Sequence, residues 1–270
     1  MIRNKLAVIG YGNMAKAIVN GIISAEFDIS DIIVFDVNSA QYAASFASNI
    51  IKTSDSLESA VFEADAVLLS VKPQNFPEVL PQIKAIDGYQ NKLYISIAAG
   101  ISTEYIRNEL GNVDAVRVLP NIPMTIGQGV SVICRNENVA TADFDYVKNV
   151  FSKSGSVIEI EECEINRFIG VTSSAPAYVF KFIDAICKGA EVQGIEYDRV
   201  LDAVCDMLIG SAMMLKQGDL SPQELISRVA SKGGTTEQAL LVLDNRDFSG
   251  IVSDAMRACT DKAEELGQIK

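Results

Sequence analysis

The chain has 270 residues, 49% of them hydrophobic and 21% charged, which is enough for one large domain and a smaller one. Its net charge of −12 argues against general nucleic-acid binding, because that binding needs Lys and Arg to neutralise phosphates. The sequence contains no histidine, so mechanisms with an imidazole base are excluded and no metal site is expected.

The N-terminal residues do not resemble a secretion signal, because only four apolar residues precede Gly10 after Lys5. No apolar run approaches the ~20 residues that span a bilayer. The cysteines are scattered, odd in number and lack a C-x-x-C motif. We therefore expect reduced thiols in a cytoplasmic protein that does not associate with membranes.

Short apolar runs rich in Val and Ile alternate with helical stretches over roughly the first 160 residues, a length typical of one domain. Such runs are typical of strands buried on both faces, and the alternation predicts a doubly wound parallel sheet. The predicted strands are Leu6–Ile9, Ile32–Phe35, Ala66–Val71, Leu93–Ile97, Ala115–Leu119, Val130–Cys134 and Val157–Ile160. Helices are expected at Asn13–Ala25 and at Thr103–Leu110, the second capped by Ser102 or Thr103.

Helices alone are expected after about Glu162. We predict a dinucleotide-binding domain over residues 1–162 and an all-α domain over 163–270. Its helices are expected at Pro176–Val192, Asp198–Lys216, Pro222–Ser231 and Phe248–Leu266. The first of these is apolar on most sides, so it must be buried in a core or against another subunit. We therefore expect this domain to form a homodimer or a higher oligomer.

A Gly-x-Gly-x-x-Ala motif follows the first strand and begins the first helix, at Gly10, Gly12 and Ala15. Gly10 permits the tight turn, Gly12 permits close approach of the backbone to a pyrophosphate, and Ala15 permits tight helix packing. The amides at the start of this helix, Asn13 and Met14, would face the pyrophosphate. This predicts a dinucleotide site.

Asp36 ends the second strand about 24 residues after Gly12, close to the usual spacing of an acid that binds the adenosine ribose. A carboxylate here would repel a 2′-phosphate, which favours NADH. Asn38 and Ser39 retain the ability to hold that phosphate, so NADPH and NADH both stay open as cofactors.

Several loops and turns resemble those of the pyrroline-5-carboxylate reductase family. They read Val71-Lys72-Pro73-Gln74, Ser96–Gly100, Leu119–Pro123, Ser173–Tyr178 and Ser231–Thr236, in the family's order and over nearly the whole chain. The resemblance implies a Rossmann-like domain followed by a dimerising helical domain, and reduction of the C=N bond of 1-pyrroline-5-carboxylate to L-proline. It also implies cofactor contacts from Ser56, Val71, Lys72, Pro73, Ala98, Ala99, Gly100 and Asn121.

The Ser231–Thr236 segment is the predicted substrate site, because two glycines followed by hydroxyls at a helix start can hold an anion. By resemblance, Ser231 and the backbone of Gly233, Gly234, Thr235 and Thr236 would hold the substrate carboxylate. Thr236 would also hydrogen-bond the ring nitrogen, so Thr236 and Ser231 are the predicted catalytic residues.

The chain departs from the family pattern at three places. Lys232 replaces the usual Pro, which leaves the loop less rigid and adds a cation near the predicted carboxylate site. Residues 172–175, Thr-Ser-Ser-Ala, replace a more glycine-rich stretch, and Ile122 replaces the usual Thr. None of these changes removes a residue predicted to make a main contact.

Imine reduction agrees with the lack of histidine, because a protonated cyclic imine accepts hydride directly and needs no further proton donor. A ketone would need a donor at the developing alkoxide. Two alternatives stay open: a β-hydroxyacid dehydrogenase-like enzyme that uses Lys181, and a regulatory protein that binds a dinucleotide without catalysis.

Overall fold

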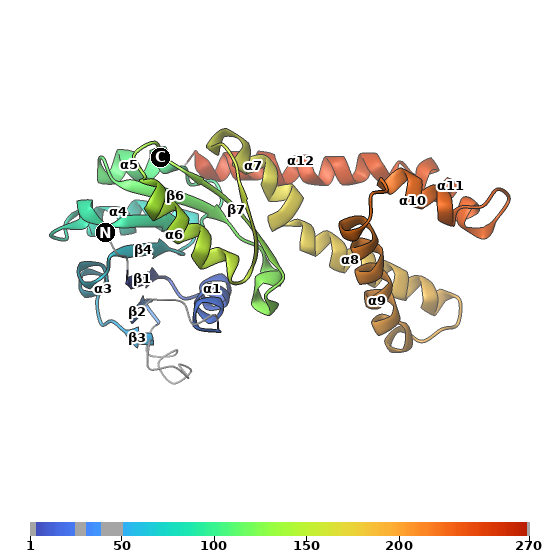
Figure 1. Cartoon of the computed structure of the whole chain (residues 1–270), viewed down its shortest axis with the longest axis horizontal. Helices are drawn as coiled ribbons and strands as arrows, with labels where there is room; N and C mark the ends of the chain where they lie inside the picture. The colour runs from blue at the N-terminus through green and yellow to red at the C-terminus, as the bar shows by residue number, and fades with distance from the viewer. Residues whose placement is uncertain (1–3, 25–30, 39–50, 269–270) are drawn as a thin grey trace. The chain divides into compact units, whose positions relative to one another are not determined.

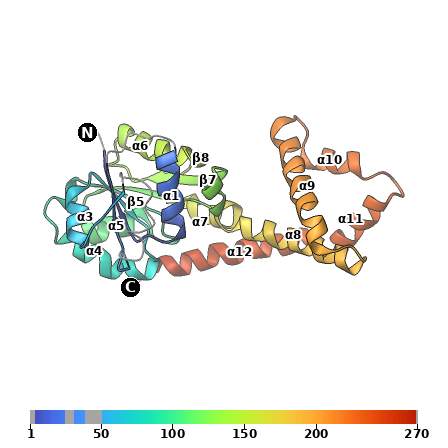
Figure 2. The same cartoon turned by 90° about the horizontal axis from the view of Figure 1, so that it is seen from below.

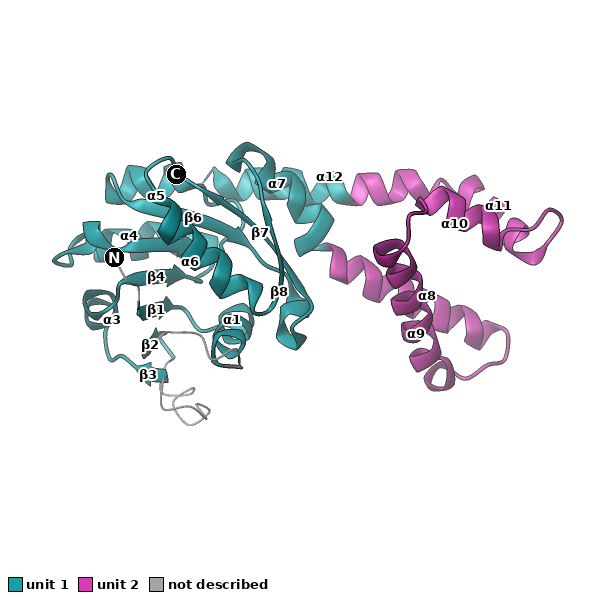
Figure 3. Cartoon of the chain, viewed as in Figure 1, with its two compact units in different colours: residues 1–174, 256–270 teal, residues 175–255 magenta. Residues whose placement is uncertain are grey.

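The computed structural model describes residues 4–24, 31–38 and 51–268 (Figure 1). They form two compact units, which we describe separately (Figure 3). Unit 1 contains residues 1–174 and 256–270, and unit 2 contains residues 175–255. Unit 1 therefore includes the C-terminal end of the last helix. The functional boundary between residues 162 and 163 stays a prediction.

Unit 1 is built on an eight-stranded sheet with the order β3-β2-β1-β4-β5-β6-β7-β8. The strands are β1 (Lys5–Ile9), β2 (Asp31–Phe35), β3 (Ile51–Thr53), β4 (Ala66–Leu69), β5 (Leu93–Ser96), β6 (Asp114–Leu119), β7 (Gly129–Arg135) and β8 (Gly155–Glu159). All seven predicted strands are present, with shifted ends. The strand β3 was not predicted, since it has three residues and two of them are exposed.

The predicted doubly wound parallel sheet is confirmed except at one pair, where β7 runs antiparallel to β6. Only a short connection with one 3-10 segment (Ile122–Ile126) lies between them. A parallel crossover takes about a dozen residues or more, usually with a helix, so this connection is too short for one. The pairing returns to parallel between β7 and β8.

Strand side chains alternate between two cores, one on each face of the sheet. Leu6 and Val8 of β1 pack on the face covered by α1 (Asn13–Ser24) and α6 (Thr141–Ser152). Ala7 and Ile9 pack on the opposite face, which is covered by α3 (Leu57–Glu63), α4 (Phe76–Lys84) and α5 (Thr103–Leu110) (Figure 2). Burial on both faces is thus confirmed for the central strands, whereas the edge strand β8 is largely exposed. Ser102 caps α5, as expected, by accepting from the Tyr105 amide.

A third cluster covers β6 and β7 with α7 (Ile165–Phe168) and with Ala263, from the part of the last helix that belongs to unit 1. Beside this cluster lies Arg117 of β6, which is 3% exposed. Its guanidinium donates to Asn166 at 2.7 Å and lies 4.0 Å from the Glu162 carboxylate. Glu162 also accepts from the Thr103 amide at 2.7 Å. Burial lowers the pKa of Arg117, and these partners compensate its buried charge.

Unit 2 consists of α8 (Ala175–Val192), α9 (Tyr197–Gln217), α10 (Pro222–Val229), α11 (Thr235–Asn245) and the start of α12 (Phe248–Gly267). Its helices bury few side chains in the single chain: among residues 175–255, only Cys187 and Val204 are buried. On α8, which the sequence predicts to be buried, Phe180 is 58% exposed and Phe182 is 41% exposed. Among the helices that the structure describes, none has the length and apolar character to cross a membrane.

Candidate dinucleotide and substrate sites

The turn after β1 requires glycine at its first position. Gly10 has a φ of +88°, and a Cβ there would lie 3.0 Å from the backbone nitrogen of Val71 on the neighbouring strand connection. The Gly10 amide donates to the carbonyl of Phe35 at 2.8 Å, and the Ser70 hydroxyl donates to the carbonyl of Gly10. These contacts bring the ends of β1, β2 and β4 together.

Gly12 differs from Gly10, because a Cβ built on it meets no atom within 4 Å. The backbone of Gly12 therefore borders open space at the start of α1. Ala15, in the first turn of α1, is 1% exposed and packs against the sheet. The roles that the sequence motif predicts for these three small residues agree with this geometry.

Asp36 is held in place by the backbone on both sides. Its Oδ2 accepts from the Tyr11 amide at 2.8 Å, and its Oδ1 accepts from the Asn38 amide at 2.8 Å. Tyr11 is buried, and that burial raises the pKa of its hydroxyl. The carboxylate thus links the end of β2 to the glycine turn after β1.

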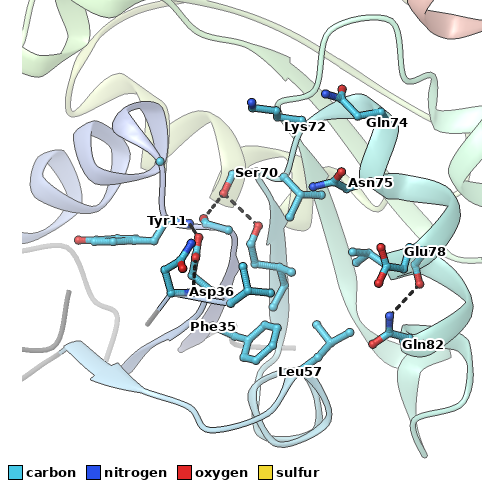
Figure 4. A pocket seen from close by; sticks show the side chains of 17 residues that line it. Tyr11, Phe35, Asp36, Leu57, Ser70, Lys72, Gln74, Asn75, Glu78 and Gln82 are labelled. Atoms are coloured by element: carbon cyan, nitrogen blue, oxygen red, sulfur yellow. Dashed lines mark hydrogen bonds between the residues drawn. The ribbon is translucent and has the colours of Figure 1, made fainter. Parts of the chain in front are cut away.

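A cavity of about 550 Å³ lies at the carboxyl ends of β1, β2 and β4 (Figure 4). This is the point where the strand order reverses, the usual ligand crevice of open α/β sheets. Six predicted cofactor residues line the cavity: Gly10, Gly12, Asp36, Asn38, Val71 and Lys72. Sequence reasoning missed the polar lining from the segment after Lys72, which comprises Gln74, Asn75, Glu78 and Gln82.

Other predicted cofactor residues lie outside the lining of this cavity. Asn13 and Met14 begin α1, Ser56 caps α3 by accepting from the Ser59 amide at 3.0 Å, and Pro73 begins a short 3-10 turn. Ala98, Ala99 and Gly100 follow β5. Ser39 lies outside the described residues.

Asn121 follows β6, and both ends of its amide are engaged within unit 1. Its Nδ2 donates to the carbonyl of Thr172 at 3.0 Å, and its Oδ1 accepts from the Val130 amide at 2.8 Å. The hydroxyl of Ser173 donates to the carbonyl of the adjacent Pro120 at 3.1 Å. Asn121 therefore links the end of β6 to β7 and to the π-helical segment Ile169–Ser173, a structural role that the sequence did not predict.

The predicted substrate residues gather in one turn of unit 2, before α11. Gly233 has a φ of +74°, and its amide donates to Oε2 of Glu237 at 2.7 Å. The Gly234 amide donates to the carbonyl of Ser231 at 3.0 Å, and a Cβ on Gly234 would lie 2.5 Å from the Ser231 hydroxyl. Thr235 and Thr236 begin α11.

Thr236 also lines an apolar cavity of about 310 Å³ within unit 2, together with Met214 and Leu240. Ser211 and Arg228 contribute polar groups to the same lining. Neither this cavity nor the contact between Gly233 and Glu237 was predicted from the sequence.

The strand order, the glycine turn and the acid at the end of β2 define a Rossmann-type dinucleotide-binding protein. The family described as pyrroline-5-carboxylate reductase dimerisation matches residues 162–266, and the family described as coenzyme F420-dependent NADP oxidoreductase matches residues 5–100.

Relatives over the full length narrow this class. The pyrroline-5-carboxylate reductases of Aquifex aeolicus and Haemophilus influenzae are 32% and 33% identical to this chain, over 97% of both chains in each case. The crystal structure of Plasmodium falciparum pyrroline carboxylate reductase with NADP bound matches with a TM-score of 0.89 and 27% identity, over 98% of each chain. The chain belongs to the pyrroline-5-carboxylate reductase family, which confirms the resemblance found in the sequence.

Proposed function

We propose that this protein catalyses the NAD(P)H-dependent reduction of 1-pyrroline-5-carboxylate to L-proline, the last step of proline biosynthesis. The observation that carries the proposal is full-length similarity to reductases of that name, in a chain with an open cavity at the dinucleotide turn.

The residues at the glycine turn fit a dinucleotide. The missing side chain of Gly12 leaves open space where a pyrophosphate would approach the start of α1, and the amides of Asn13 and Met14 would bind it. Asp36 would hold the adenosine ribose, and the segments around Lys72, Ala98 and Asn121 would contribute further contacts. When bound, the reduced nicotinamide supplies the hydride for the reaction.

The turn before α11 would hold the substrate. We assign the carboxylate to Ser231 and to the backbone amides of Gly233, Gly234, Thr235 and Thr236, because amides at a helix start favour an anion. At Gly233 the substrate would replace the Glu237 carboxylate, which now accepts from that amide. The Thr236 hydroxyl would hydrogen-bond the ring nitrogen and orient the C=N bond. Ser231 and Thr236 thereby act by positioning the substrate.

No general base is needed for this reduction, which agrees with a chain that lacks histidine. If the imine binds in its protonated form, hydride addition to carbon gives the neutral secondary amine directly. The protein then has to orient the ring and exclude water. We assign the orienting role to the Thr236 hydroxyl, and the largely apolar cavity that Thr236 lines would limit the access of water.

We also propose that the chain self-associates through the helices of unit 2. Support comes from the match to a dimerisation family and from side chains such as Phe180, Val242 and Ile251, which are 58%, 59% and 60% exposed in the single chain. Large exposed apolar patches mark interaction surfaces. We further propose a cytoplasmic location, where thiols such as those of Cys134 and Cys163 stay reduced.

The direct test is the loss of NADH or NADPH absorbance when purified protein meets 1-pyrroline-5-carboxylate, with proline identified as the product. The alternative hydroxyacid dehydrogenase chemistry would use Lys181, which lies exposed on α8. Turnover of the imine by a Lys181→Ala variant at the wild-type rate would therefore separate the two reactions. Protein that binds a dinucleotide but reduces no cyclic imine would overturn the proposal.

A further inference from the structure

We infer that the dinucleotide cavity selects NADH over NADPH, and that Asp36 makes the selection. The inference rests on the proposed function and names the cofactor that this site takes. It sets the chain apart from the Plasmodium falciparum relative, whose crystal structure has NADP bound.

The position of the Asp36 carboxylate is fixed before any ligand binds. Each of its oxygens accepts one backbone amide at 2.8 Å, from Tyr11 on one side and from Asn38 on the other. The carboxylate cannot rotate away from the cavity without breaking both bonds. A carboxylate offers about four lone-pair positions, so its oxygens can still accept the 2′- and 3′-hydroxyls of a ribose. A 2′-phosphate offers no such donor and places negative charge beside a carboxylate.

The charged residues that line the cavity do not compensate the negative charge of a 2′-phosphate beside Asp36. Among the described lining residues the acids are Asp36 and Glu78, and Lys72 is the single cation. In the view of Figure 4, Ser70 lies between Asp36 and the Lys72 side chain. Lys16 is not in the lining, and its ammonium lies 5.9 Å from the centre of the Tyr11 ring.

The sequence after Asp36 supplies no cation before Lys52, which lies in β3 and outside the cavity lining. In folds of this kind that bind NADP, an arginine near this position accommodates the 2′-phosphate. Residues 37–51 here contain neither Lys nor Arg. The hydroxyl and amide groups of that segment can donate hydrogen bonds, but they cannot neutralise a charge of about −2 next to Asp36.

The first experiment measures binding of NADH and of NADPH to the wild-type protein by calorimetry, together with kcat/KM for each cofactor in the reductase assay. We expect NADH to bind at least about tenfold more tightly, with the same order in kcat/KM. Equal binding, or tighter binding of NADPH, would overturn the inference. Calorimetry reports selectivity even if no imine is reduced, so failure of the proposed reaction and failure of the inference are distinguishable.

The second experiment assigns the selection to its residue. Asp36→Asn keeps the size and one carbonyl oxygen but removes the charge, so the NADH-to-NADPH affinity ratio should fall about tenfold or more. The matched control is Asp65→Asn, because the Asp65 carboxylate also accepts two backbone amides, from Asn4 and Lys5 at 3.0 Å, outside the cavity lining. The control should leave the ratio unchanged. A ratio that falls equally in both variants, or in neither, would contradict the role of Asp36.

Discussion

Gly100, in the turn after β5, lies directly against Gly267 at the end of α12. A Cβ on Gly100 would stand 2.7 Å from the backbone nitrogen of Gly267 and 2.6 Å from the carbonyl oxygen of Ala263. Gly100 also has a φ of +81°. The last turn of α12 thus packs directly against a loop of the predicted dinucleotide domain. This close contact needs a residue without a side chain at position 100.

Gly100→Ala should destabilise unit 1 far more than its backbone angle alone explains. The matched control is Gly111→Ala, because Gly111 has a φ of +87° but a Cβ there meets no atom within 4 Å. We expect the control to cost about 1–3 kcal/mol of unfolding free energy. Gly100→Ala should cost about 1–3 kcal/mol more, because its Cβ must displace α12. Urea denaturation measures both, and equal losses would show that α12 is not packed against Gly100.

Gly10→Ala and Gly12→Ala should separate folding from dinucleotide binding. Gly10 combines a positive φ with contacts of 3.0 Å to Val71, so alanine there should lower stability by about 1–3 kcal/mol. Gly12 borders open space, so Gly12→Ala should change stability by less than about 0.5 kcal/mol. Both variants should bind NADH about tenfold or more weakly. Full NADH affinity in a stable Gly12→Ala protein would place the pyrophosphate elsewhere.

Thr236→Ala should reduce catalysis more than cofactor binding. Loss of one hydrogen bond to the ring nitrogen predicts a fall of about tenfold in kcat/KM for the imine. Thr236→Ser keeps the hydroxyl and should retain most activity. Calorimetry with NADH should give near wild-type affinity for both variants. Wild-type turnover by Thr236→Ala would rule out the assigned role.

Phe180→Lys should weaken self-association, because it places a charge on an apolar side chain that is 58% exposed on α8. Ile126→Lys is the control, since Ile126 is 75% exposed but belongs to unit 1. Analytical ultracentrifugation should show a lower mass for the first variant alone. The same wild-type mass for both would mean that this side of α8 is not in the interface.

The cysteines should differ in reactivity. Burial, chiefly, raises the pKa of the Cys134 thiol to about 12 from an ordinary value of 9.0. Cys163 is exposed and should react first with a thiol reagent in the folded protein, whereas Cys134 should react only on unfolding. Mass spectrometry of the labelled protein measures this order, and early labelling of Cys134 would contradict it.

The raised pKa of Cys134 also determines whether the free energy of unfolding rises or falls with pH. Below pH 9.0 the Cys134 thiol is protonated in both the folded and the unfolded chain, and its contribution to stability is complete. Between about pH 9 and 12 only the unfolded chain loses this proton, so stability should fall as the pH rises. Cys134→Ala should show a shallower fall over that range in urea denaturation, after correction for its lower starting stability.

The sequence by itself determined seven of the eight strands described in the sheet, the glycine turn and the acid at the end of β2. The strands of the doubly wound sheet are buried on two faces, so they read as continuous apolar runs, and the turn needs glycine within a few residues of a strand. These requirements are local, so the residue types within each short segment of the sequence reveal them. The helices of unit 2 were also predictable, because breaks such as Gly218 and Pro222 mark their ends.

Tertiary structure alone decided what depends on residues far apart in the chain. The contact of Gly267 with Gly100, the link of Asn121 to Thr172 and the Tyr11 amide that holds Asp36 join positions separated by up to the length of a domain. No local period or spacing in the sequence specifies such a pair, because each residue is compatible with its own turn, strand or helix whether or not the distant partner is present. The antiparallel β7 belongs here too, since a strand's apolar pattern is the same in both directions and only the short connection excludes the parallel pairing.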